Sequence, residues 1–78
     1  MWLVSIQDFL KEKGWPFQYA EEDGFGSIDF EYRGIGYHIW EFKEERYGAE
    51  SNVKDGGKQE DYYGDYENQI INIIKEWR

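Results

Sequence analysis

The stretch from Gly26 to Glu45 constrains the fold more than any other part of the chain, because its residue types alternate in two successive runs. In the first run the apolar positions are Ile28, Phe30 and Tyr32. In the second run the aromatic positions are His38, Trp40 and Phe42. Period-two alternation is typical of a β-strand with one buried face. The stretch therefore predicts a β-hairpin whose two strands contribute one face to a core.

The turn of this hairpin decides which side chains of the second strand face the core, because a shift of one residue turns a strand over. Glycines supply positive φ at low cost, so the turn is expected at Gly34–Gly36. A three-residue loop there pairs Phe30 with Trp40 and Ile28 with Phe42, which puts the large apolar groups on one face. A two-residue loop of Gly34 and Ile35 mixes the faces. With the three-residue loop, the open face of the hairpin carries Asp29, Glu31, Arg33, Tyr37, Ile39, Glu41 and Lys43.

Two amphipathic segments flank the predicted strands. The first has Ser5 as its N-cap and ends at Gly14, a residue that adopts the left-handed conformation of a helix C-terminus. The second follows Asp65, which is also a favoured N-cap residue. Their apolar stripes have helical spacing, which predicts two helices that pack on a core. The stripes are Leu3, Ile6, Phe9 and Leu10 in the first segment, and Tyr66, Ile70, Ile73, Ile74 and Trp77 in the second.

The remaining segments complete a fold prediction. Phe17 and Tyr19 alternate with polar or small residues and predict a short strand, which ends in a turn at Glu21–Gly24. Residues 46–65 show no period and are expected to form a long polar, tyrosine-rich loop. The sequence thus predicts one small α+β domain over residues 1–78. Its architecture is a two-layer α-β-β-β-α arrangement, a three-stranded antiparallel meander with both helices on one sheet face.

Composition narrows the classes of function. The net charge is −8, from 17 acids against 9 bases, which opposes binding to nucleic-acid phosphates or to an anionic membrane and favours a basic partner. No run of 18 apolar residues is present and the N-terminus does not resemble a secretory signal, so a cytoplasmic location without membrane contact is expected.

The chain has no Cys and one His, which excludes a Cys/His zinc site. The lone His38 is interpreted as a structural residue.

One motif carries a catalytic alternative. Asp29 precedes Glu41-Phe42-Lys43 on the next predicted strand, after an N-terminal helix. This arrangement resembles the core of the PD-(D/E)xK nucleases, over residues 5–43. The resemblance implies Mg²⁺ or Mn²⁺ bound by Asp29 and Glu41, with Lys43 positioning or activating the attacking water. The other interpretation is that Asp29 and Glu41 are solvent-face residues and Lys43 is their cross-strand charge neighbour.

Aromatic residues make up 21% of the chain, which is more than a small core can hide, so some are expected on a binding surface. The preferred hypothesis is a non-catalytic protein-interaction or regulatory module without a cofactor, which binds an unknown protein partner or forms a homodimer. The expected binding surface is Tyr37, Ile39, Tyr47, Tyr62 and Tyr63. The alternatives are the metal-dependent nuclease and an acidic mimic of nucleic acid that inhibits a DNA- or RNA-binding protein.

Overall fold

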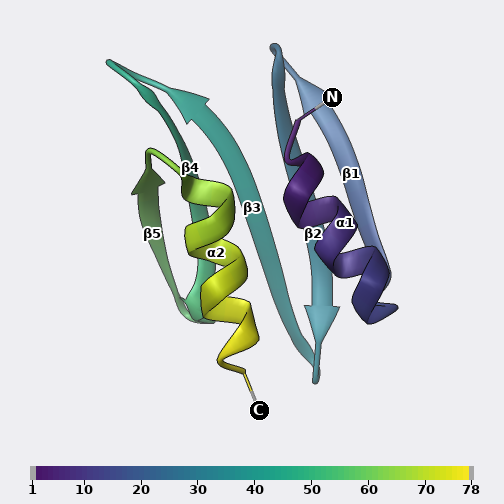
Figure 1. Cartoon of the computed structure of the whole chain (residues 1–78). Coiled ribbons are helices and arrows are strands. Elements are labelled where there is room, and N and C mark those ends of the chain that lie inside the picture. The colour runs from purple at the N-terminus through teal and green to yellow at the C-terminus, as the bar shows by residue number, and fades with distance from the viewer. Residues whose placement is uncertain (1, 78) are drawn as a thin grey trace.

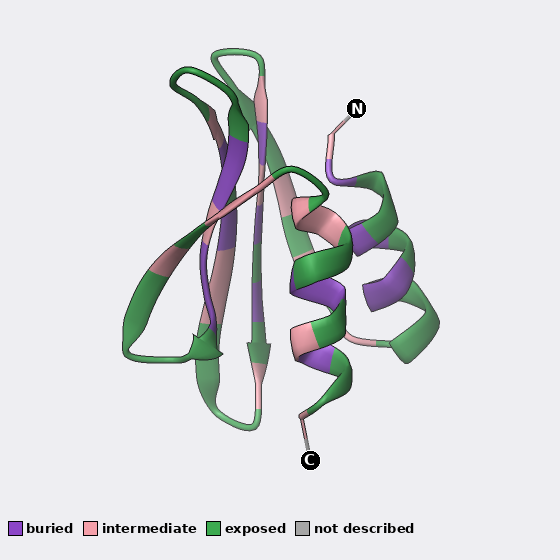
Figure 2. Ribbon diagram, turned by 60° about the vertical axis from the view of Figure 1, so that its left-hand side comes forward, coloured by how far each residue is buried: buried purple, intermediate pink, exposed green. Residues whose placement is uncertain are grey.

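The computed structural model describes residues 2–77 as a five-stranded antiparallel sheet and two helices (Figure 1). Along the chain the elements are α1 (Val4–Lys13), β1 (Phe17–Glu22), β2 (Phe25–Tyr32), β3 (Ile35–Lys43), β4 (Tyr47–Asp55), β5 (Lys58–Tyr63) and α2 (Tyr66–Lys75). The strands lie side by side in chain order, and both helices lie on one face of the sheet (Figure 2). The α+β class is confirmed, but the sheet has five strands where the sequence predicted three.

The helix termini combine expected and unexpected features. Gly14 ends α1 with a φ of 73°, as predicted. The N-terminus of α1 differs from the prediction, because the helix begins at Val4 and Ser5 lies inside its first turn. The Oε1 atom of Glu67, on α2, accepts hydrogen bonds from the backbone N–H groups of Ser5 at 3.0 Å and Ile6 at 3.3 Å. The cap that the sequence assigned to a local side chain therefore comes from the other helix. Neither described helix is long and apolar enough to cross a membrane.

The predicted loop at residues 46–65 is wrong, because most of it forms the β4–β5 hairpin. The inward side of β4 is built from small residues, with Ala49 and Ser51 fully buried. Ser51 Oγ donates a hydrogen bond to the His38 carbonyl oxygen at 2.7 Å, which satisfies this buried hydroxyl. A Cβ at Gly48 would lie 2.8 Å from the Tyr62 carbonyl oxygen, so the strand needs glycine there. The small residues of β4 show no hydrophobic alternation, although the strand packs against α2.

The predicted turn of the β2–β3 hairpin is also wrong. Arg33, with a φ of 53°, and Gly34, with a φ of 81°, form the two-residue turn, and both angles fit the primed turns that close tight hairpins. Phe30 consequently lies opposite Tyr37 instead of Trp40. This register differs from the predicted one by an odd number of residues, which turns β3 over. The face of β3 that was expected in the core therefore lies on the side of the sheet away from the helices, and the expected open face lies toward them.

The core lies between the sheet and the two helices. Ile39 has no exposed surface, whereas its neighbour Trp40 is 53% exposed, which shows the orientation of β3 directly. The cluster of buried apolar residues consists of Leu3, Ile6, Phe9, Leu10, Ile28, Phe30, Ile39, Ala49, Val53, Ile70, Ile71 and Ile74. The predicted helical stripes supply much of this core. The sheet face that the helices leave uncovered is called the outer face below.

Candidate functional site

Trp40 lies near the centre of the outer face. The strand register places one row of residues directly across all five strands: Ala20, Ser27, Trp40, Glu50 and Asp61. Trp40 is the middle member of this row and has the highest exposed fraction, 53%, of the large exposed hydrophobic residues. Its ring lies 5.2 Å from the His38 ring, measured between centroids. An indole that is half exposed on the open face of a sheet gains little from the core and remains free to contact a partner.

The outer face carries negative charge around Trp40. The acids at its outward positions are Glu22 on β1, Asp29 and Glu31 on β2, Glu50 on β4 and Asp61 on β5. No Lys or Arg occupies an outward position in the paired parts of the described strands. The paired outward positions are therefore more uniformly acidic than the chain as a whole, and the exposed Lys54 lies on β4 beyond them.

Glu50 and Asp61 lie directly opposite each other on neighbouring strands. Like charges in this position destabilise a sheet. Within residues 2–77, no hydrogen bond or ion pair joins either carboxylate to another residue. The fold thus keeps an unfavourable charge pair next to its most exposed tryptophan.

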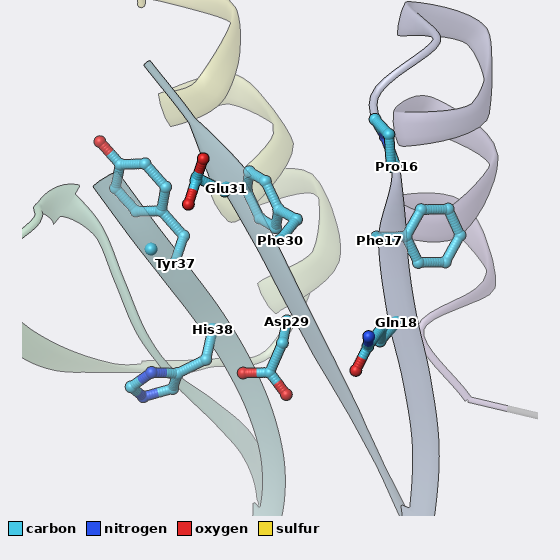
Figure 3. Close-up of a pocket in the computed structure, with 9 residues that line it drawn as sticks. Pro16, Phe17, Gln18, Asp29, Phe30, Glu31, Tyr37 and His38 are labelled. Carbon is cyan, nitrogen blue, oxygen red and sulfur yellow. The ribbon is translucent and has the colours of Figure 1, made fainter. Parts of the chain in front are cut away.

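Shallow hollows surround Trp40 on the outer face. One is lined by Trp40, Phe42, Glu50 and Asp61, and another by Trp40, Phe25, Ser27 and the acids Glu22 and Asp29. A third hollow extends the acidic surface along the sheet. In this third hollow Asp29 lies between Gln18 and His38, and the three residues come from three neighbouring strands (Figure 3). These hollows are open to solvent and suit side chains of a docked surface better than an enclosed small molecule.

The nuclease-like residues do not come together. Asp29 is exposed on the outer face, whereas Glu41 is 7% exposed and faces the helices. Lys43 lies on the same side of β3 as Glu41, and its Nζ atom is 5.0 Å from the centre of the Tyr47 ring. The predicted common face of Asp29, Glu41 and Lys43 depended on the wrong hairpin register. Among the described residues, no group of three or more His, Asp or Glu is placed to hold a metal ion.

The predicted binding surface is divided between the two sides of the sheet. Tyr63 lies on the outer face, with its ring 5.7 Å from the Phe42 ring. Ile39 is in the core, and Tyr37 faces inward against Trp77 with ring centroids 4.5 Å apart. The strand register places the other two predicted residues, Tyr62 and Tyr47, on the side of the sheet that faces the helices. Tyr47 is nevertheless 46% exposed, because it lies at the start of its strand.

Sequence reasoning missed Trp40, His38 and Phe42 as surface residues, because it assigned them to the core. The signal that could have placed them is Arg33-Gly34, since a glycine at the second position of a two-residue turn is common in tight hairpins. Arginine rarely adopts a positive φ, as Arg33 does here. The turn was therefore predicted at the neighbouring glycines, for which a positive φ is common.

The buried side chain of Glu41 is held by hydrogen bonds from two other elements of the fold. Its Oε1 atom accepts a hydrogen bond from the Gly26 backbone N–H at 3.1 Å, and its Oε2 atom accepts one from the Tyr66 hydroxyl. Burial raises the pKa of Glu41 above its ordinary value, and the hydrogen bonds from Tyr66 and Gly26 oppose that rise. The pKa of Tyr66 is raised too, first by burial and then by its hydrogen bond to Glu41. This carboxylate links β3 to α2 and to the β1–β2 hairpin.

The raised pKa of Glu41 predicts a pH dependence of stability. A carboxyl group whose pKa is higher in the folded state binds more protons there than in the unfolded chain, so its contribution to stability falls as pH rises. We expect the wild type to lose unfolding free energy relative to Glu41→Gln as pH rises above the ordinary value of 4.5. Urea unfolding of both proteins from pH 4.5 to 7 measures this difference. A difference that is constant, or that changes in favour of the wild type, would contradict the assignment.

Comparisons of the chain with models of protein families, with curated proteins and with solved structures give no match. The support for a function therefore comes from the outer face itself, with its exposed tryptophan and the acids at its paired outward positions.

Proposed function

We propose that the protein is a non-catalytic interaction module that binds a basic protein partner on its outer face. The observation that carries the proposal is the position of Trp40, which is 53% exposed at the middle of an acid-lined row of residues. Tryptophan is enriched among the few residues that supply most of the binding energy of protein interfaces. An aromatic centre with a polar rim is also the usual anatomy of such an interface.

Charge complementarity identifies the kind of partner. A second copy of the chain in a symmetric dimer would place the acids of one outer face against the same acids of the other. Nucleic acid would meet the same repulsion from its phosphates. A basic protein surface is attracted, and such attraction speeds association and disfavours wrong partners. The partner that best fits the outer face is therefore a protein with a positively charged docking surface.

The local energetics also support binding over a purely structural role. The opposed acids Glu50 and Asp61 weaken the β4–β5 pairing, and Trp40 contributes exposed apolar area that a monomer does not need. Features that break local rules of stability are expected at functional sites. A basic partner would neutralise the charge pair and cover the indole in one step.

A second candidate specifies the partner further. Because the paired outward positions carry acids and no Lys or Arg, negative charge there is not mixed with positive charge, as a mimic of nucleic acid requires. In this version the basic partner is a nucleic-acid-binding protein, and the outer face occupies its nucleic-acid groove. Added DNA or RNA would then release the partner from this chain, whereas a partner of another kind would stay bound.

A capture experiment with matched variants tests the proposed function. The wild type, Trp40→Ala and Val4→Ala are immobilised and exposed to the same cell extract. Val4 is the control because it is 43% exposed but lies on α1, on the opposite side of the sheet from the outer face. We expect a basic protein on the wild type and on Val4→Ala, with its affinity for Trp40→Ala lower by about tenfold or more, as for a binding hot spot.

Two results would refute this function. One is a partner whose affinity is the same for Trp40→Ala as for the wild type, because it would bind elsewhere. The other is a retained partner with an acidic docking surface, because the charge argument would then fail. Weaker retention at high salt is expected in addition, since exposed charges are screened.

A further inference from the structure

The hollow between Trp40 and the β4–β5 hairpin is lined by two aromatic residues, by acidic residues and by Lys43. Its lining includes Trp40 and Phe42 from β3, Glu50 from β4 and Asp61 from β5. The two carboxylates are direct cross-strand neighbours, and Glu50 is also the direct neighbour of Trp40. One side chain that enters this hollow can therefore lie on the indole and reach both acids.

A similar combination lies on the other side of Trp40. That hollow is lined by Trp40 and Phe25, with the carboxylates of Glu22 and Asp29 nearby. In the row across the sheet, Trp40 lies between the two hollows, with Ser27 on one side of it and Glu50 on the other. The indole thus forms a wall shared by two hollows, each of which presents an aromatic ring together with negative charge.

We propose that these two hollows are binding sites for arginine side chains of the basic partner, an inference that rests on the proposed function. The guanidinium group is planar, so it stacks on an indole face, and its N–H groups bind carboxylates in pairs. A lysine ammonium is a compact, strongly hydrated charge that does neither as well. The opposed acids Glu50 and Asp61 fit a group that donates in several directions, because each carboxylate can accept from a different N–H.

The chain itself contains an example of this contact at the rim of the outer face. The guanidinium carbon of Arg46 lies 4.3 Å from the centre of the Tyr63 ring. Tyr63 in turn contacts Phe42, which lines the first hollow. An arginine from the chain thus already covers the aromatic ring at one end of this face. The rings of Trp40 and Phe42 lie further along the same surface, next to Glu50 and Asp61, which form no ion pair with any residue from 2 to 77.

An NMR titration with two defined peptides tests the inference. The probes are a hexa-arginine peptide and a hexa-lysine peptide, which have equal length and charge. We expect the arginine peptide to shift the Trp40 indole N–H and the amides of Glu50 and Asp61, and to bind about three times more tightly than the lysine peptide. Glu50→Gln/Asp61→Asn should remove most of the arginine preference. Asp8→Asn/Glu12→Gln, which removes the same charge from exposed positions of α1, should keep it.

The acid variants also separate binding from structure. Because Glu50 and Asp61 repel each other, neutralising them should leave the thermal midpoint unchanged or raise it, while the preference for the arginine peptide is lost. Equal affinities for the two peptides would overturn the arginine sites and leave a general basic partner in place. Shifts centred on α1 or on the helical layer would also overturn them. The proposed function fails by a different result, which is a captured partner that is indifferent to Trp40→Ala.

Discussion

Asn52→Ala is expected to lower the free energy of unfolding by about 2–3 kcal/mol, because Asn52 connects three backbone groups near the irregular part of the β4–β5 pairing. Its Oδ1 atom accepts a hydrogen bond from the His38 N–H at 3.0 Å. Its Nδ2 atom donates to the carbonyl oxygens of Gly36 and Gly56, both at 3.1 Å. Asn52 itself is 6% exposed, so water replaces these bonds incompletely.

Chemical denaturation of Asn52→Ala and Asn72→Ala measures the effect against a matched control. Asn72 is an exposed residue of α2, where alanine is a better helix former, so its replacement should change stability by no more than about 0.5 kcal/mol. In the thermal midpoint, we expect a decrease of roughly 10 °C or more for Asn52→Ala in a domain of this size. Equal stabilities of the two variants would show that the hydrogen bonds of Asn52 to the backbone do not stabilise the fold.

Trp77→Ala is expected to cost about 3 kcal/mol of unfolding free energy, since Trp77 closes one end of the core. Its ring stacks on Trp15 at 6.2 Å between centroids and contacts Tyr37 at 4.5 Å and Tyr32 at 5.2 Å. Its Nε1–H donates a hydrogen bond to the Val53 carbonyl oxygen at 3.1 Å. The residue therefore ties the end of α2 to β4 and to the segment after α1.

Trp40→Ala is the natural control for Trp77→Ala, because it makes the same substitution on the opposite side of the sheet. Because Trp40 is exposed, Trp40→Ala should lower the free energy of unfolding by no more than about 0.5 kcal/mol, as is usual for surface substitutions. Urea unfolding of both variants therefore reports which tryptophan belongs to the core. The account of the fold would be contradicted if Trp40→Ala were the more destabilising of the two.

The helices and the first turn could be predicted from the sequence because their signals are local. Gly14 ends α1 in the left-handed conformation, and Asp23 and Gly24 form the predicted turn with φ values of 52° and 81°. The stripe of α2 was predicted with Ile70 and Ile74, which are buried. Helical periodicity and aspartate-glycine turns follow from single segments, so tertiary contacts did not alter them.

The register of β2–β3 and the β4–β5 hairpin depend on contacts that lie far apart in the sequence. Placing Glu41 inward is acceptable only because Gly26 and Tyr66, from two other elements, supply its hydrogen bonds. β4 tolerates Ser51 and Asn52 in buried positions because β3 supplies backbone partners. Local alternation of apolar residues carries no information about such partners.

The error in the candidate site follows from the same register. Turning β3 over exchanged Ile39 for Trp40 on the outer face and separated Asp29 from Glu41. Net charge does not depend on the register, so the expectation of a basic partner stays a prediction that this error does not change. The expectation of an exposed aromatic surface carries over to the proposed interface, with different residues at its centre.

Site-specific photocrosslinking in a cell extract tests the central claim, that a basic protein docks on the outer face, most directly. A photoreactive phenylalanine derivative replaces either Ser27, the direct neighbour of Trp40, or Asn72, an exposed residue of α2. We predict a discrete adduct with a basic protein from position 27, lost when Trp40→Ala is added, and none from position 72. An adduct of equal yield from position 72, or one that survives Trp40→Ala, would contradict the claim.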